Sequence, residues 1–261
     1  TCTSLPFLFT RTTFFLPALA LSYKLDRPVG TGDNMTQTMA STKSLESLIE
    51  ERYSCRGFLP DGIDGTEIEK MIELAERAPS WKNAQSYKIV ALTGEKKDAL
   101  CRDLIERARS GAEPAAEIPY ETGYPSSIRR RMMDLAVAFF AQLGIDRKDK
   151  DAREKQTLRN FNGFGAPVIL FAFIPAGLRE WTILDLGVFF GHLTLVVRSH
   201  GYESILQAAL AAWPDIVRKH TGVGDEYTLV VGMSIGKADP SEPANHFKSQ
   251  RAPASEILQI L

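Results

Sequence analysis

The sequence RYSCR at residues 52–56 places two arginines symmetrically about a serine. In an extended chain successive side chains alternate between opposite sides, so Arg52, Ser54 and Arg56 share one side and Cys55 takes the other. Two guanidinium forks and a hydroxyl on one surface match the donors that a phosphate group requires. The alternative is an exposed basic loop, because this spacing alone is a weak signal. Cys55 is expected to be a buried, unreactive thiol.

The sequence on either side of this stretch predicts helices. Residues 43–52 carry leucines and an isoleucine at helical spacing. Apolar residues recur on one helical face from Ile68 onward. Thr66 and Glu69 resemble a capping box at the start of this second helix. Pro79 is expected to end it near Ala78, because the residue before a proline disfavours the helical conformation.

The remainder of the chain alternates predicted helices with a few predicted strands. Helices are predicted at 94–110, 128–143, 183–200 and 213–220, and strands at 87–93, 167–173 and 227–235. The continuous apolar run at 167–173 is typical of a strand buried on both faces. The charge run at 146–155 is interpreted as solvated surface, and residues 201–210 as a turn away from the preceding helix.

Composition excludes several classes of protein. A length of 261 residues fits one large or two small domains, and a net charge of −1 argues against a general nucleic-acid binder. Three cysteines form no disulfide framework, which favours a reducing compartment, and no C-x-x-C or His/Cys cluster predicts a metal site. The sequence also lacks a dinucleotide-binding G-x-G-x-x-G, a P-loop and a G-x-S-x-G motif.

The first 34 residues differ from the rest of the sequence. They are apolar and rich in Ser and Thr, which suits a targeting segment or an extension upstream of a start at Met35. Thr10–Thr13 and Pro17 interrupt the apolar run, so it does not predict a membrane span. We expect residues 1–43 to be a disordered or loosely attached extension and residues 44–261 to form the folded domain.

A polar loop at 78–86 lies between a predicted helix and a predicted strand. Ser80, Asn83 and Gln85 stand in this loop. Loops at such positions often carry ligand contacts. The alternative is an ordinary turn in which the Asn and Ser side chains bond their own backbone.

Five pieces of the sequence, in this order, resemble the FMN-dependent nitroreductase family. They are R-x-S-x-R-x-F at 52–58, A-P-S-x-x-N-x-Q at 78–85, F-G-A-P at 164–167, the segment 185–207, and the strand, glycine and basic tail at 232–251. The resemblance covers about residue 44 to the C-terminus. The first basic stretch and the A-P-S-x-x-N-x-Q loop are its most specific parts.

The resemblance implies an α+β fold with a central mixed, mostly antiparallel sheet wrapped by helices, in an intertwined homodimer. It implies that FMN lies at the dimer interface and that NAD(P)H docks transiently to reduce it. The expected activity is ping-pong transfer of hydride through flavin N5 to nitroaromatics, quinones or similar conjugated acceptors, in the cytoplasm. Because the flavin carries the chemistry, no side chain is expected to be catalytic.

The resemblance also implies roles for ten residues. Arg52, Ser54 and Arg56 match positions that contact the flavin phosphate, ribityl chain or ring. Ser80 and Asn83 match a loop contributed by the partner chain, and Gln85 is expected near the ring edge. The backbone near Gln207 and Ala208 matches the segment that approaches N5. Lys248 and Arg251 match tail cations that join the phosphate site.

Departures from the family pattern put the acceptor in doubt. Trp81 and Lys82 stand where smaller residues are common, and the region 111–143 is long enough to cover part of the acceptor pocket. Tyr120, Tyr124 and residues 129–131 are candidates for either that pocket or plain surface. The alternatives are a reductive dehalogenase or flavin-modifying enzyme of the same fold, a flavin-binding protein of low turnover, and a structural helical protein without flavin.

Overall fold

The computed structural model describes residues 43–261. The predicted extension at 1–43 therefore lies outside the described residues, apart from Lys43. The helices are α1 (Leu45–Glu51), α2 (Gly65–Ala75), α3 (Gly94–Arg109), α4 (Ser126–Gln142), α5 (Lys150–Leu158), α6 (Glu180–Ser199) and α7 (Pro214–Thr221). The strands are β1 (Lys88–Thr93), β2 (Val168–Pro175), β3 (Glu203–Gln207) and β4 (Tyr227–Gly236).

The four strands form one antiparallel sheet in the order β1-β2-β4-β3. Every residue of β2 from Val168 to Ile174 is buried, which confirms the prediction of a strand covered on both faces. A single parallel bridge joins Ser54 to Ser204 at the outer edge of β3. The predicted α+β fold with a mostly antiparallel sheet is confirmed.

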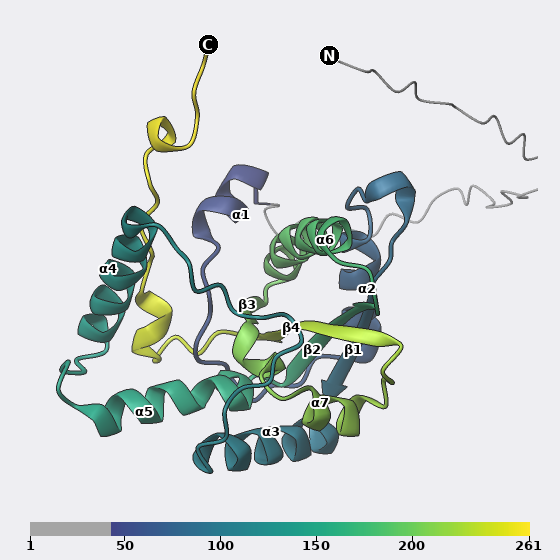
Figure 1. Ribbon diagram of the computed structural model, residues 1–261, viewed down its shortest axis with the longest axis horizontal. Coiled ribbons are helices and arrows are strands. Elements are labelled where there is room, and N and C mark those ends of the chain that lie inside the picture. Colours follow the sequence, from purple (N-terminus) through teal and green to yellow (C-terminus); the bar gives the residue numbers. More distant parts are fainter. Residues whose placement is uncertain (1–42) are drawn as a thin grey trace, which may run out of the picture. The chain divides into compact units, whose positions relative to one another are not determined.

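Helices cover both faces of the sheet (Figure 1). One core contains α2 and α6 packed on Val168, Leu170 and Ala172. The other contains α3 and α7 packed on the alternate residues Ile169 and Phe171, as the period-two geometry of a strand requires. The result is a three-layer arrangement with β3 at one edge of the middle layer.

Helix α6 is the one described helix that is long and apolar enough, by composition, to cross a membrane. Its residues Leu186, Phe189, Leu193 and Val197 are buried against the sheet. A buried core helix can be as long and as apolar as a membrane span, and the packing of α6 is that of a core helix.

Three local predictions are wrong. Residues 203–207 form strand β3 instead of the predicted turn, whereas the charge run at 146–155 is surface as predicted, and helix α5 begins within it. Helix α2 begins after Asp64, whose carboxylate accepts the N–H of Thr66 at 2.8 Å, so Asp64 is the cap and the expected Thr66 capping box does not form. The same helix ends at Ala75, three residues before the predicted stop.

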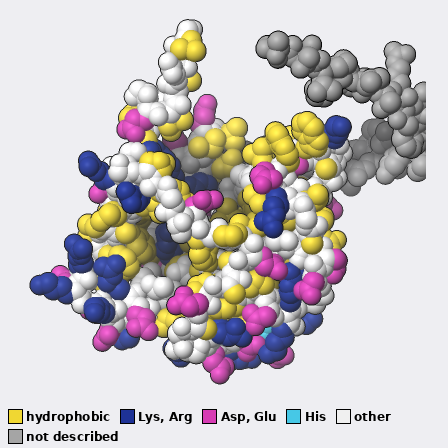
Figure 2. All heavy atoms as spheres, viewed as in Figure 1, with side chains coloured by type: hydrophobic (Ala, Val, Ile, Leu, Met, Phe, Trp, Pro, Cys, Tyr) yellow, Lys and Arg dark blue, Asp and Glu magenta, His cyan; other side chains and the backbone are white. Residues whose placement is uncertain are grey.

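Helix α4 stands outside the three layers and runs beside the C-terminal segment (Figure 1). It contains no buried residue, and its apolar side chains Met133 and Val137 are 64% and 65% exposed. Figure 2 shows that the face in view is hollowed between the α4 side and the α6 side, with hydrophobic side chains inside the hollow. Phe139 packs against Phe247, but the exposed apolar side chains on the rest of α4 indicate that another surface packs on it.

Candidate functional site

The predicted basic stretch, residues 52–56, lies along the edge of β3 that does not pair with β4. Ser54 bridges to Ser204, and the Cys55 N–H donates to the Ser204 carbonyl at 3.1 Å. Because the two segments run parallel, residues 52–56 and the end of β3 at Gln207 are neighbours in space. Two of the sequence-predicted site segments are therefore brought together within one chain.

The side chains of this stretch divide as the alternation predicts. Cys55 is fully buried, while Arg52, Ser54 and Arg56 are each partly exposed. Burial raises the pKa of the Cys55 thiol to about 11, so it carries no thiolate near neutral pH. The prediction that this thiol is buried is confirmed, and that it is unreactive stays a prediction.

Arg56 is a half-buried cation without a carboxylate partner among the described residues. One of its guanidinium nitrogens donates to the Ser54 carbonyl at 3.1 Å, and the guanidinium lies 4.8 Å from the centre of the Phe139 ring. Burial lowers its pKa, because removal from water disfavours the charge. A desolvated guanidinium in this state is a natural site for an anion.

Gln156 faces the same small pocket of about 80 Å³ and was missed by the sequence analysis. It is only 9% exposed, and its side-chain nitrogen has no hydrogen-bond partner among the described residues. A buried amide donor without a partner is costly and therefore points to a missing acceptor. The only sequence signal was Gln156 and Asn160 at helical spacing, and the preceding charge run concealed it.

Arg52 lines a different pocket of about 440 Å³ between β3 and α6. Its other lining residues include Leu186, Phe190 and Leu206, with Gly187 and Gly191 on the helix. A mostly apolar pocket with one cation at its margin suits a flat apolar group that carries a negative substituent.

The side chain of Gln207 is engaged within the fold, so only its backbone is available to a ligand. The side chain is 3% exposed; its nitrogen donates to the Asn160 carbonyl at 3.0 Å, and its oxygen accepts the Ser234 hydroxyl at 2.6 Å. These bonds fix the backbone that leads into Ala208. The Tyr120 hydroxyl donates to the Ala208 carbonyl at 3.4 Å, which places the 111–125 loop over this point.

The loop at 78–86 is strained and exposed. Lys82, Asn83 and Gln85 have φ values of 50°, 57° and 46°, a region that non-glycine residues rarely occupy. Helix α6 anchors the loop, because both carboxylate oxygens of Asp185 accept the Trp81 N–H at 3.1 and 3.0 Å. The Ser80 hydroxyl accepts the Gln85 N–H at 3.2 Å. The loop lines none of the pockets that contain Arg52 or Arg56.

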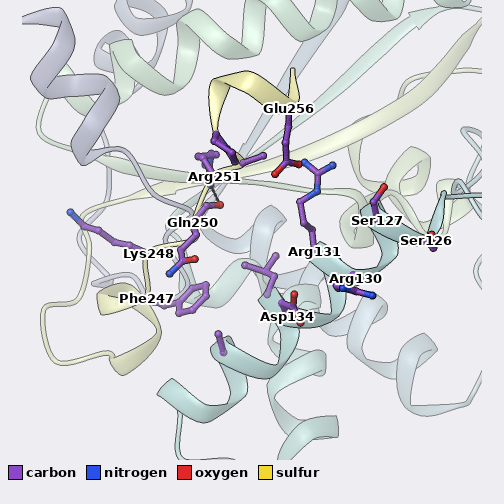
Figure 3. Close-up of a pocket in the computed structure, with 14 residues that line it drawn as sticks. Ser126, Ser127, Arg130, Arg131, Asp134, Phe247, Lys248, Gln250, Arg251 and Glu256 are labelled. Carbon is purple, nitrogen blue, oxygen red and sulfur yellow. Dashed lines mark hydrogen bonds between the residues drawn. The ribbon is translucent and has the colours of Figure 1, made fainter. Parts of the chain in front are cut away.

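The tail cations lie in a third pocket, of about 750 Å³, between α4 and the C-terminal segment. Figure 3 shows Arg131 and Glu256 pointing toward each other across it. Lys248 and Arg251 line this pocket, and Arg251 donates to the Ser249 hydroxyl at 2.6 Å. One chain therefore does not gather Arg52, Arg56 and Arg251 at one point, and their shared phosphate site stays a prediction.

Comparison with known proteins gives a consistent result. The model of the nitroreductase family matches residues 49–237. A 4-nitrobenzoate reductase of Pseudomonas putida is 32% identical over 84% of this chain and 96% of its own length. The crystal structure of an FMN and NADPH-dependent nitroreductase, NfnB, from Sphigopyxis sp. strain HMH is 30% identical with a TM-score of 0.81, over 84% of this chain and 99% of that one. The FMN-dependent NfnB of Mycobacterium smegmatis, solved in complex with NADPH, is 28% identical with a TM-score of 0.79, over 83% and 97%.

Proposed function

The chain belongs to the nitroreductase family, and from this membership we propose that it is an FMN-dependent oxidoreductase that uses NADPH to reduce nitroaromatic compounds. The observation that carries the proposal is the pair formed by Arg56 and Gln156. Arg56 has no carboxylate partner among residues 43–261, the Gln156 nitrogen has no acceptor among them, and both side chains face one pocket. An electron-rich, anionic group would satisfy both.

The residues present fit FMN. The cations Arg52 and Arg56 suit its phosphate or the carbonyl edge of its ring, and the unpartnered nitrogen of Gln156 suits a ring carbonyl. The apolar pocket beside Arg52 suits a flat ring system. Ser54 and the backbone at Gln207 and Ala208 complete the set from this chain. We keep Lys248 and Arg251 as proposed phosphate ligands.

Bound FMN would supply the chemistry of hydride transfer between the nicotinamide and the acceptor. The protein's part is electrostatic and positional. Arg56 places a fixed positive charge where negative charge develops, and its desolvation strengthens that effect. The bonds of Gln207 to Asn160 and Ser234 hold the backbone at Ala208 in one position.

We propose that the working form is a homodimer with the flavin at the interface, and that the partner contributes its Ser80–Gln85 loop. The support is exposed apolar surface that one chain leaves uncovered. Trp181 and Leu184 on α6 are 65% and 56% exposed, and Trp81 lies 5.4 Å from Trp181 between ring centres. Exposed tryptophans beside a strained polar loop are typical of a surface that meets another chain.

NADPH is the proposed hydride donor because the two structural relatives are named for it. Nitrobenzoates and related nitroaromatics are the proposed acceptors, with quinones as further conjugated acceptors. We propose that residues 44–261 form the catalytic domain and that it works in the cytoplasm. The free thiols of Cys55 and Cys101 support a reducing compartment.

The proposal is tested by anaerobic stopped-flow spectroscopy. The purified protein is expected to be yellow, and mixing with NADPH is expected to bleach its flavin absorbance. Subsequent mixing with 4-nitrobenzoate is expected to restore the absorbance. A colourless preparation that binds no added FMN would refute the proposal. A flavin that NADPH and NADH both fail to reduce would favour a flavin-binding protein of low turnover.

A further inference from the structure

The backbone at Arg56 and Gly57 is held by a side chain from the segment that follows β4. The Asn245 side-chain oxygen accepts the Arg56 N–H at 2.7 Å. The Asn245 side-chain nitrogen donates to the Gly57 carbonyl at 2.8 Å and to the Asp239 carbonyl at 2.9 Å. Asn245 is 8% exposed, and its bond to the Gly57 carbonyl is buried while the other two are partly buried. The amide thus uses its acceptor and both donors.

A second contact holds the carbonyl of Arg56. An Arg159 guanidinium nitrogen donates to the Arg56 carbonyl at 2.9 Å and forms an ion pair with Glu242 at 2.6 Å. Glu242 in turn lies against Gly57, where an added Cβ would sit 2.4 Å from the Glu242 Cγ. Gly57 is therefore a position where the close approach of a side chain requires glycine.

These contacts fix the backbone of Arg56 from both sides. Its N–H and its carbonyl are both bonded to side chains far away in sequence, and the Asp239 N–H also donates to the Gly57 carbonyl at 3.0 Å. Releasing them would leave the buried Asn245 amide without partners, which is unfavourable. Only the side-chain rotamers of Arg56 remain free, and Phe139 restricts these. A ligand that uses Arg56 then meets a group already in place.

We propose that Asn245, supported by Arg159 and Glu242, is a positioning residue that sets Arg56 for flavin binding. The inference rests on the proposed function, because it takes Arg56 to be an FMN ligand. It assigns to the segment 239–246 a role in the site that does not involve touching the cofactor. If this is correct, substituting Asn245 changes the affinity for FMN only when Arg56 is present.

The experiment is a double-mutant cycle with N245A, R56A and the double variant in the full-length protein. Holoenzyme of each variant is dialysed against graded FMN, and the retained flavin gives the dissociation constant. N245A is expected to raise that constant about tenfold or more. In the R56A background the same substitution is expected to change it less than about twofold, since the two residues act as one unit. Full additivity of the two effects would overturn the inference.

Ser241→Ala is the matched control. Ser241 lies in the same turn and its hydroxyl donates to the Asp239 carboxylate at 2.6 Å, but among the described residues it forms no hydrogen bond with Arg56 or Gly57. It is expected to leave the FMN dissociation constant unchanged. A tenfold rise in S241A as well would show that any disturbance of the turn weakens FMN, which would also overturn the inference.

Arg159→Gln in a Gln156→Met background serves if N245A does not fold, because it removes the donor to the Arg56 carbonyl and leaves Asn245 intact. The Gln156→Met background already lacks the bond between Arg159 and Gln156, so that bond cannot contribute to the result. Arg159→Gln is expected to show the same loss of additivity with R56A, and additive effects would overturn the inference in its place. Failure of the proposed function and failure of the positioning role give different results. Wild-type protein that retains no FMN would refute the proposed function, whereas FMN-binding wild type with an additive cycle would refute only the positioning role.

Discussion

A buried amide nitrogen without a hydrogen-bond partner costs a folded protein on the order of 1–3 kcal/mol, and among the described residues the Gln156 side chain carries such a nitrogen. Stability alone would favour an apolar residue of similar size at this position. A polar residue that weakens the empty protein and faces a desolvated cation is typical of a binding site. Gln156 therefore predicts opposite effects on stability and on cofactor affinity.

Gln156→Met is expected to stabilise the flavin-free protein by about 1 kcal/mol, because it removes the unpartnered nitrogen. It also removes the acceptor of one Arg159 bond of 3.2 Å, but Arg159 is partly exposed and can bond water instead. FMN affinity is expected to fall about tenfold. Thermal unfolding of flavin-free protein and FMN titration measure the two effects.

Gln142→Met is the control for this substitution, because Gln142 is exposed on α4. It is expected to change stability by less than about 0.5 kcal/mol and to leave FMN affinity unaltered. If Gln156→Met instead destabilises the flavin-free protein while FMN affinity holds, Gln156 is a structural residue and not a ligand.

At the scale of elements, Arg198 ties α1 and α6 to β3. Its guanidinium pairs with Glu51 at 2.6 Å and with Glu203 at the start of β3, and its remaining nitrogen, Nε, has no described partner. Glu51 directly precedes Arg52. The ion pairs thus hold the end of α1 beside the strand that the basic stretch follows.

Arg198→Met is expected to destabilise the protein by about 3 kcal/mol near neutral pH, because it leaves Glu203 charged and poorly hydrated. Burial already raises the pKa of Glu203, and loss of Arg198 raises it further. The destabilisation should therefore shrink as pH falls and Glu203 takes up a proton. Urea unfolding at two pH values tests this, with the exposed Arg102→Met as the control. Equal losses at both pH values would contradict it.

Glu51 gives a separate acid dependence. Hydrogen bonds from Lys43, then Arg198 and Ser47, lower the pKa of Glu51 from 4.5 to about 2. A lowered carboxyl pKa contributes stability that is present above 4.5 and is lost as the pH falls toward 2. Glu51→Gln is expected to flatten the fall in stability across this range. An unchanged acid transition, followed by circular dichroism, would show that the pairing has no net effect.

Most elements could be predicted from the sequence because their apolar residues recur with a clear period. Strand β3 could not, since Ser204 and Gln207 are buried polar residues and Leu206 is exposed, so its pattern alternates in neither sense. It is a strand because β4 pairs with it. Helix α5 was hidden by its charges, as only Gln156 in it is buried.

At the scale of the molecule, the sequence resemblance indicated residues that one chain does not bring together. The resemblance supplied Arg52, Arg56 and the tail cations, but a single chain distributes them over three pockets. It could not supply Gln156, Asn245 or Arg159, whose roles arise from contacts between distant segments. Periodicity reports which face of an element is buried, and it carries no information about such pairs.

Leu184→Glu tests the proposed homodimer. Leu184 is 56% exposed on the outer face of α6, so a charge there is harmless to a single chain and unfavourable in an apolar interface. The variant is expected to run as a folded monomer in analytical ultracentrifugation and to retain little FMN. Circular dichroism verifies its folding. A dimer that keeps its flavin would remove α6 from the interface.

The bond between Asn245 and the backbone of Arg56 joins residues 189 positions apart. During synthesis on the ribosome, Arg56 leaves the exit tunnel long before Asn245 is made. The sheet edge that Ser54 joins needs β3 and β4, which are also made late, and the backbone of Arg56 stays unanchored until translation has passed the region after β4. Capture of the flavin is thus expected to be a late event in biogenesis, and ribosome-bound chains stalled before residue 245 should emerge without colour.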